Sequence, residues 1–228
     1  MGSTRPIEPE SSAPATAPEG AEDLTALGEP ISLRDGSRVR IRQARPSDAQ
    51  LLVRGFYRLS PSSSYRRFFS ASPVITQEMV NDLTDIDHRD HEAIVALDQR
   101  GTEGLGIAHY LRSPERADTA ELALTVIDDW QGRGLGTLLL EVISARACQE
   151  GIKTFTALML AENHEMRGLL ERLGPVRIID EALGTVEVEV PIPAVRLAPA
   201  LRKLLRIAAR HDAASPLTPA DADPRSSA

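Results

Sequence analysis

A short segment of this chain, Trp130 to Thr137, carries three glycines at alternate positions. The residues before it, 120–127, are mostly apolar like a buried strand, and apolar residues recur after it at helical spacing. Glycines let the main chain approach a ligand closely. The first amides of a helix have no partner inside the helix and add partial positive charge. The segment is therefore expected to bind a phosphate group.

Two common phosphate-binding motifs fit this segment poorly. The Walker motif needs a Lys followed by Ser or Thr, and no Lys directly follows these glycines. The dinucleotide fingerprint needs a third glycine where Thr137 stands, and an acidic residue about 20 positions further on. The next apolar segment, 154–160, has no acidic residue, and the first to follow is Glu162.

The pattern Gln131-x-x-Gly134-x-Gly136 resembles the signature with which the GNAT superfamily of N-acetyltransferases binds the pyrophosphate of coenzyme A. The segment 163–174 resembles a second signature, a helix led by Asn and ending in Leu-Gly. The resemblance covers residues 38–191. It implies a mixed α/β (α+β) fold of the GNAT acyl-CoA N-acyltransferase type, with a central sheet flanked by helices. It also implies acetyl-CoA as co-substrate and no metal.

The same resemblance places the cofactor against the glycine segment and the strand before it. In the superfamily that strand separates from its neighbour and pairs with the pantetheine arm, and a main-chain amide near residues 124–126 polarises the thioester carbonyl. Arg133 is either a phosphate ligand or a solvated arginine, and Asn163 is a cofactor ligand, a helix cap or both. The predicted cofactor-binding residues are Thr125, Val126, Ile127, Gln131, Gly132, Arg133, Gly134, Leu135, Gly136, Thr137 and Asn163.

Glu121 interrupts an apolar strand ten residues before Gln131 and is the predicted general base. A partly desolvated carboxylate at the acetyl end of the cofactor would have a raised pKa and accept a proton more readily. Several protein acetyltransferases of the superfamily carry a Glu on this strand. A solvent-facing glutamate is the alternative, and His109 on the preceding strand is the second candidate base.

The chain departs from the superfamily pattern at Leu170. Many members have a Tyr at this place, seven residues after the Asn, which protonates the departing thiolate. The general acid is therefore not identified, and water or the proton held by the base would have to serve.

A third segment, Leu59 to Phe69, resembles a motif of the bacterial protein lysine acetyltransferases of the Pat type. These enzymes acetylate a lysine on acyl-CoA synthetases and related enzymes. The expected function is thus acetyl transfer to a protein lysine. The alternatives are a small-molecule amine acetyltransferase and a non-catalytic acyl-CoA sensor. The acyl-chain preference and the oligomeric state stay open.

The elements that must position these residues follow from periodicity. Ser47 and Gln50 form a predicted capping box at the start of the first helix, which Ser60-Pro61 ends. The predicted strands are 38–42, 91–97, 105–111, 118–127, 154–160, 176–180 and 185–190, and the later helices are 76–83, 136–150 and 163–173.

Composition restricts the class of protein. The net charge of −7 comes from the acidic termini, because residues 31–211 are close to neutral, which argues against a nucleic-acid partner. The single cysteine excludes an internal disulfide and a cysteine zinc site. His88, Asp90 and His91 lack the spacing of a metal site. No apolar run is long enough to span a membrane, so a cytoplasmic location without membrane partners is expected.

The chain is expected to have four parts. Residues 1–30 form a disordered acidic tail rich in Pro, Ala, Ser and Glu, and residues 31–193 form the GNAT domain. Residues 194–211 form an amphipathic basic helix, which either docks on its own domain or binds a partner. Residues 212–228 form a second disordered tail.

Overall fold

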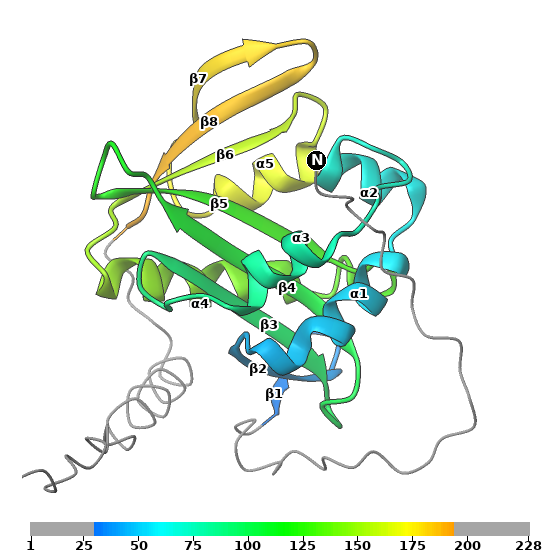
Figure 1. The fold of residues 1–228 in the computed structure, drawn as a ribbon. Coiled ribbons are helices and arrows are strands. Elements are labelled where there is room, and N and C mark those ends of the chain that lie inside the picture. The colour runs from blue at the N-terminus through cyan, green and yellow to red at the C-terminus, as the bar shows by residue number, and fades with distance from the viewer. Residues whose placement is uncertain (1–29, 194–228) are drawn as a thin grey trace, which may run out of the picture. The chain divides into compact units, whose positions relative to one another are not determined.

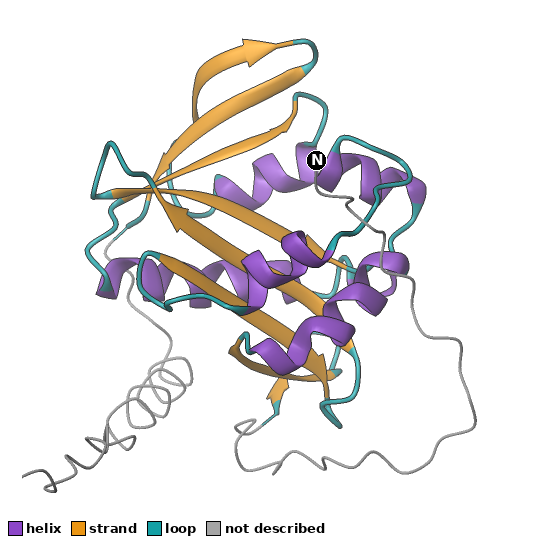
Figure 2. Ribbon diagram, in the orientation of Figure 1, coloured by secondary structure: helices purple, strands orange, loops and turns teal. Residues whose placement is uncertain are grey.

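The computed structural model describes residues 30–193. Eight strands form one sheet in the spatial order β1-β2-β3-β4-β5-β6-β8-β7, with helices on its faces (Figure 2), and this mixed arrangement confirms the predicted fold class. The strands are β1 (Ile31–Ser32), β2 (Arg38–Gln43), β3 (His91–Asp98), β4 (Gly104–Arg112), β5 (Thr119–Val126), β6 (Thr154–Leu160), β7 (Arg177–Ala182) and β8 (Thr185–Pro191). The helices are α1 (Ala49–Tyr57), α2 (Pro61–Phe68), α3 (Gln77–Thr84), α4 (Leu135–Gln149) and α5 (His164–Leu170), with 3-10 turns at Pro46–Asp48 and Asp128–Trp130.

The core lies on both faces of the central strands. β3 is buried along nearly its whole length, because α4 packs against β3, β4 and β5 while α1 packs against β4. Figure 1 shows α1 and α3 in front of these strands and α4 behind them. β7, at the edge of the sheet, is exposed throughout.

The sheet changes character between β5 and β6. Every other neighbouring pair is antiparallel, whereas β5 and β6 run parallel and are paired only from Thr119 opposite Thr154 to Glu121 opposite Thr156. Beyond that point β5 stays paired with β4, and β6 stays paired with β8. The two strands lie together at one end and apart at the other (Figure 1). Their separation leaves main-chain groups of β5 without a strand partner.

The segment after α1 differs from the sequence prediction. The first helix ends at Tyr57, and Ser60-Pro61 begins α2, an element that the apolar pattern did not reveal. Ser60 caps this helix by accepting a hydrogen bond from the Ser63 amide, and Pro61 occupies its first position. The spacing of apolar residues did not predict α2 because its sequence, PSSSYRRF, consists mostly of serines and arginines and has no repeating apolar face.

The predicted capping box of Ser47 and Gln50 is wrong. Asp48 instead caps the start of this helical segment, because its carboxylate accepts a hydrogen bond from the Arg45 amide at 2.8 Å. Both Asp48 oxygens are also bonded to the Arg42 guanidinium, each at 2.6 Å, and the pair is buried. Because this bidentate ion pair is buried, it fixes Asp48 rather than the exposed Ser47 as the residue that caps the helix start.

The predicted terminal segments, 1–30, 194–211 and 212–228, lie outside the residues that the structure describes, apart from Pro30. Within residues 30–193, no helix combines the length and the apolar character needed to cross a lipid bilayer.

Candidate active site

A cleft of about 520 Å³ opens where β5 and β6 separate. This volume is in the range of small-molecule binding sites. The cleft runs from the glycine segment, past the outer half of β5, to Glu121 and α2. Nine of the twelve predicted site residues line it: Glu121, Thr125, Val126, Gln131, Gly132, Gly134, Gly136, Thr137 and Asn163.

The glycine segment turns the chain from β5 into α4. Gly132 and Gly134 have φ of +73° and +93°, a backbone region that side chains disfavour, and Gly134 is the residue at which α4 begins. Gly136 and Thr137, in the first turn of α4, border the cleft. The unpaired amides and the positive end of the helix dipole thus lie beside the cleft, which favours a bound anion there.

The side chain of Gln131 is used within the fold. Its Nε2 donates to the Val126 carbonyl at 2.9 Å and to the Ser63 hydroxyl at 3.2 Å. Gln131 therefore joins the end of β5 to α2 through its side chain.

Asp128 fixes α2 from the same turn. Its carboxylate accepts hydrogen bonds from the Ser60 amide, the Ser60 hydroxyl and the Ser63 hydroxyl, at 2.9, 2.6 and 2.9 Å. Burial raises the pKa of Asp128, but these hydrogen bonds outweigh burial and the pKa is lowered overall. The turn before α4 and helix α2 are thus held together by an ionised carboxylate.

Main-chain groups of β5 face the cleft at alternate residues. The Ile127 amide donates to Leu105 on β4, and the Val126 carbonyl points the other way, to Gln131. Since main-chain groups alternate in direction along a strand, those of Leu124 and Val126 face the side that β6 has left. Those of Thr125 face β4. The residue also lines the cleft, and its buried Oγ1 has no hydrogen-bond partner within residues 30–193.

Three predicted cofactor-binding residues do not line the cleft: Ile127, Arg133 and Leu135. The amide and carbonyl of Ile127 are bonded to Leu105 and Trp130. Leu135 is fully buried beneath the start of α4. Arg133 lies 5.0 Å from the centre of the Trp130 ring and pairs with Asp35 at 3.5 Å.

Asn163 caps α5. Its Oδ1 accepts a hydrogen bond from the Met166 amide at 3.1 Å, as the cap alternative expects. The residue also lines the cleft. The cap uses only the oxygen of the side chain, so the Nδ2 can still donate to a ligand.

Glu121 lies at the end of the cleft remote from the glycine segment. It is exposed, where the sequence predicted partial desolvation, and Leu111 on β4 and Thr156 on β6 lie directly opposite it. Arg67 of α2 lines the same end of the cleft, and its positive charge is attracted to Glu121. The sequence prediction did not single out Arg67, although it lies within the Leu59–Phe69 motif.

His109, the second candidate base, is held neutral. Its Nε2 lies 3.1 Å from the Arg67 guanidinium, which can only donate, so the ring nitrogen accepts. Burial, followed by the charges of Arg67 and His91, lowers the pKa of His109 to about 3. Such a weak base is poorly matched to an ammonium group at neutral pH. The geometry therefore favours Glu121 over His109.

Leu170, at the place of the superfamily Tyr, is fully buried. Within residues 30–193, no tyrosine lines the cleft. The hydroxyl of Tyr110 donates to the Arg89 carbonyl, and burial raises its pKa. Tyr110 follows His109 on β4, and its ring packs against Phe155 in the core, so the two side chains take opposite faces as expected.

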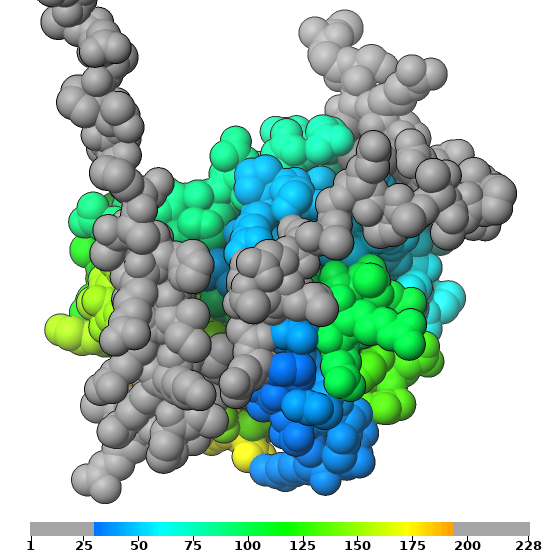
Figure 3. Space-filling view, turned by 90° about the horizontal axis from the view of Figure 1, so that it is seen from below, coloured from blue at the N-terminus to red at the C-terminus, as the bar shows by residue number. Residues whose placement is uncertain are grey.

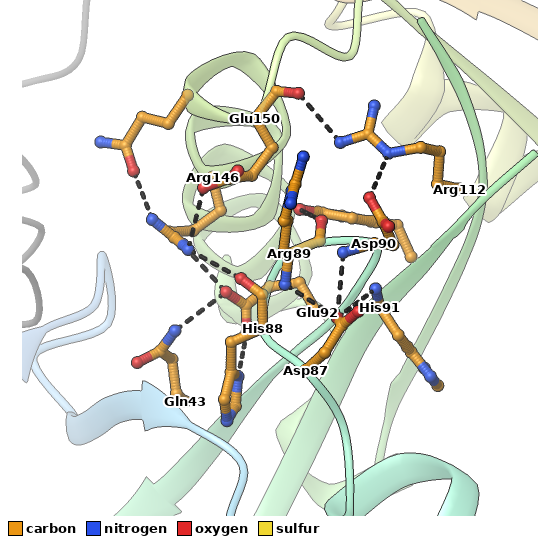
Figure 4. Close-up of polar contacts among 12 residues, drawn as sticks. Gln43, Asp87, His88, Arg89, Asp90, His91, Glu92, Arg112, Arg146 and Glu150 are labelled. Atoms are coloured by element: carbon orange, nitrogen blue, oxygen red, sulfur yellow. Dashed lines mark hydrogen bonds and ion pairs between the residues drawn. The ribbon is translucent and has the colours of Figure 1, made fainter. Parts of the chain in front are cut away.

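The polar segment around His88 and His91 forms a structural network (Figure 4). One Asp87 oxygen accepts the amides of Arg89, Asp90 and His91, each at 2.9 Å. Glu92 is fully buried and accepts hydrogen bonds from Gln43 and Arg146. Within residues 30–193, no group of three or more His, Cys, Asp or Glu side chains could hold a metal ion.

Comparison with known proteins gives consistent matches. The family model of the acetyltransferase (GNAT) domain matches residues 38–176. The acetyltransferase Pat of Mycolicibacterium smegmatis is 32% identical over 170 residues, which are 75% of this chain and half the length of that protein. The crystal structure of the GNAT domain of S. lividans PAT has a TM-score of 0.65 at 32% identity, covering 72% of this chain and 96% of that one.

A more distant structure shows the fold alone. It is a putative acetyltransferase from Salmonella typhimurium with its cofactor acetyl-CoA, and it has a TM-score of 0.55 at 18% identity. The match covers 71% of this chain and 98% of that chain.

Proposed function

Since this chain belongs to the GNAT family of acetyltransferases, we propose that it transfers an acetyl group from acetyl-CoA to the side chain of a protein lysine, with Glu121 as the general base. One observation carries the proposal: a single cleft has a helix N-terminus with a glycine turn at one end and a carboxylate at the other. Those are the two features that an acyl-CoA and an incoming amine require.

The cofactor would lie along the outer half of β5. The amides of the turn 132–137 would hold the pyrophosphate, and the main-chain groups of Leu124 and Val126 would pair with the pantetheine arm. Acetyl-CoA supplies the thioester that the amine attacks. An amide of Leu124 or Val126 would then donate to the carbonyl oxygen as negative charge develops on it, a form of stabilisation that is often the largest contribution to catalysis.

Glu121 would remove the proton that makes the lysine ammonium unreactive. The carboxylate takes one proton from the ammonium, and the amine nitrogen then forms a bond to the carbonyl carbon as the carbon–sulfur bond breaks. The nitrogen becomes positively charged in this step and loses a second proton to water, which leaves the neutral amide. The thiolate leaves with the sulfur electron pair and takes a proton from water or from Glu121. Arg67 would assist, because a positive charge near the acceptor favours the neutral amine over the ammonium ion.

The acceptor is proposed to be a protein. The motif in residues 59–69 resembles the Pat-type lysine acetyltransferases, and two of the proteins to which this chain is similar are named Pat. Exposed Phe69 and Leu158 border the acceptor end of the cleft. An apolar rim around a carboxylate suits a lysine on a protein surface better than a small, freely hydrated amine.

The test is release of free thiol from acetyl-CoA, with an acyl-CoA synthetase and a panel of small amines as separate acceptors. Release with the protein, together with acetylation of one lysine by mass spectrometry, is expected. Release only with an amine would instead support a small-molecule acetyltransferase.

A second candidate function, a non-catalytic acyl-CoA sensor, is favoured by the buried leucine at position 170. Tight binding of acetyl-CoA measured by calorimetry, with no thiol release for any acceptor, would support the sensor and contradict the enzyme.

A further inference from the structure

Arg34 lies over the glycine segment although it is far from it in sequence. It belongs to the turn between β1 and β2. Figure 3 shows that part of this N-terminal region, in dark blue, lies at the surface. The Cγ and Cδ atoms of Arg34 are 3.9 Å from the point where a Cβ on Gly134 would lie. Arg34 also lines the cleft beside Gly132 and Gly134.

The turn that carries Arg34 is ordered by its own hydrogen bonds. The Leu33 amide donates to the Ser37 carbonyl at 2.8 Å, and the Gly36 amide donates to the Leu33 carbonyl at 3.1 Å. The Asp35 carboxylate accepts from the Ser37 amide at 3.0 Å and from its hydroxyl at 2.5 Å. Asp35 also pairs with Arg133, which ties the turn to the glycine segment.

The other charges near the glycine segment already have partners. Arg133 is paired with Asp35 and stacked on Trp130. Asp128 is bonded to Ser60 and Ser63.

Asp129 pairs with Arg58 at 3.5 Å. Arg34, by contrast, has no hydrogen bond or ion pair with any side chain among residues 30–193. Among the described residues, Arg34 is thus a cation beside the glycine segment that is available to a ligand.

We propose that Arg34 binds the pyrophosphate of acetyl-CoA, from the side of the turn opposite to the α4 amides. The inference rests on the proposed use of acetyl-CoA. The planar guanidinium can donate two parallel hydrogen bonds to phosphate oxygens. The amides of the turn supply only partial charges, so a full positive charge complements them against a doubly charged group. Arg34 lies outside the residues that the family model matches, 38–176.

The experiment is calorimetric binding of three ligands to the full chain and to its Arg34→Gln variant. The ligands are CoA, 3′-dephospho-CoA and S-acetylpantetheine, of which the last has no phosphate. We expect the variant to bind CoA and dephospho-CoA about tenfold more weakly. Binding of S-acetylpantetheine is expected to stay the same, and Arg34→Lys is expected to lose less affinity than Arg34→Gln.

Two further variants serve as controls. Arg100→Gln removes an exposed arginine from the β3–β4 turn and is expected to leave all three affinities unchanged. Arg133→Gln is expected to weaken CoA binding less than Arg34→Gln, because Arg133 is engaged by Asp35. The melting temperature of each variant checks that the fold is retained.

Three outcomes would overturn the inference. Equal CoA affinity of Arg34→Gln and the unchanged chain would remove Arg34 from the site. A loss seen with CoA and absent with dephospho-CoA would assign Arg34 to the 3′-phosphate instead. An equal loss with S-acetylpantetheine would show a general disturbance of the cleft. Failure of the unchanged chain to bind CoA at all is a different result, which would contradict the proposed function itself.

Discussion

Gln131 and Arg133 are the two long polar side chains of the glycine segment, and both are engaged by neighbouring residues. What the segment offers a ligand is therefore mainly its main chain. Three charged side chains that line the cleft come from elsewhere in the chain: Glu121 from β5, Arg67 from α2 and Arg34 from the turn between β1 and β2. Chemistry at this site depends on residues that are distant in sequence.

Replacing Glu121 with Gln is expected to keep acetyl-CoA affinity within about twofold and to lower the turnover rate about 100-fold or more, because a general base contributes about 10²–10⁴ to the rate. Thiol release, with whichever acceptor supports it in the unchanged chain, measures the rate, and calorimetry measures the affinity. Glu187→Gln is the matched control, since it removes a carboxylate from β8 outside the cleft and should leave the rate unchanged. Unchanged turnover of Glu121→Gln would remove Glu121 as the base.

His109 makes the stability of the fold depend on pH. Its pKa falls from 6.5 in the unfolded chain to about 3 in the folded protein, so between these values only the unfolded chain takes up the proton. The contribution of neutral His109 to the free energy of unfolding is fully present above pH 6.5. It decreases as the pH falls towards 3, by up to about 1.4 kcal/mol per pH unit.

His109→Gln is expected to show a shallower decrease, measured as the free energy of urea unfolding at pH 7, 6 and 5. Gln can still accept the hydrogen bond from Arg67. His164→Gln, at an exposed position, is the control and should not alter the slope. Equal slopes for His109→Gln and the unchanged chain would contradict a neutral, buried His109.

At the scale of elements, the turn 128–134 has two tasks. Its glycines start α4 with free amides beside the cleft, and its Asp128 holds α2. α2 has few apolar residues of its own, so its position depends on this polar attachment. The two ends of the cleft that are proposed to hold the cofactor and the acceptor are thereby joined through one short segment.

Gly134→Asp is expected to abolish binding of acetyl-CoA, because the new carboxylate repels the pyrophosphate and the positive φ disfavours a side chain. Gly134→Ala separates these two effects, since it adds the backbone strain, roughly 1 kcal/mol, without the charge. Calorimetry with CoA compares the two variants. If Gly134→Asp binds as tightly as Gly134→Ala, the pyrophosphate does not lie at this turn.

Asp128→Asn is expected to lower the free energy of unfolding by about 1–3 kcal/mol, because it weakens three hydrogen bonds to a charged acceptor. Asp129→Asn is the matched control next to it. Its exposed pair with Arg58 should contribute less than about 0.5 kcal/mol. Urea unfolding at pH 7 measures both. Similar losses for the two variants would show that the attachment of α2 does not depend on Asp128.

The whole molecule creates the cleft by combining an antiparallel half-sheet with a second half that meets it along three residues only. β5 stays paired with β4, and β6 stays paired with β8. The two strands therefore separate as the two halves of the sheet twist away from each other. The exposed main-chain groups of β5 are stable in this state only because a ligand or water can bind them.

Acetyl-CoA is expected to slow amide exchange at Leu124 and Val126, because their main-chain groups gain a partner. Thr125, already paired with β4, should change little and serves as the internal control. At a ligand concentration 100 times Kd, the free energy of unfolding should rise by about 2.7 kcal/mol. Exchange measured by NMR and thermal unfolding with the ligand test both points. Unchanged exchange at Leu124 and Val126 would place the pantetheine arm elsewhere.

The sequence by itself determined the class of fold and predicted the two ends of the candidate site. Hydrophobic periodicity located β6 at its true bounds and the other central strands and α4 within a few residues, because alternation and helical spacing are local properties of the chain. The glycine segment between a strand and a helix indicated an anion site for the same reason. Glu121 stood out because a charge within an apolar strand is visible without a structure.

Only the tertiary structure decided which groups meet in the cleft. Strand pairing and main-chain direction decide whether the Gln131 side chain bonds to a ligand or to Val126. They also decide whether the main-chain groups of Ile127 or of Leu124 face the gap between β5 and β6. Arg34, Arg67 and the neutral state of His109 depend on contacts between residues up to a hundred positions apart. Local patterns fix local structure, whereas the burial, charge and partners of a side chain are set by the chain folded around it.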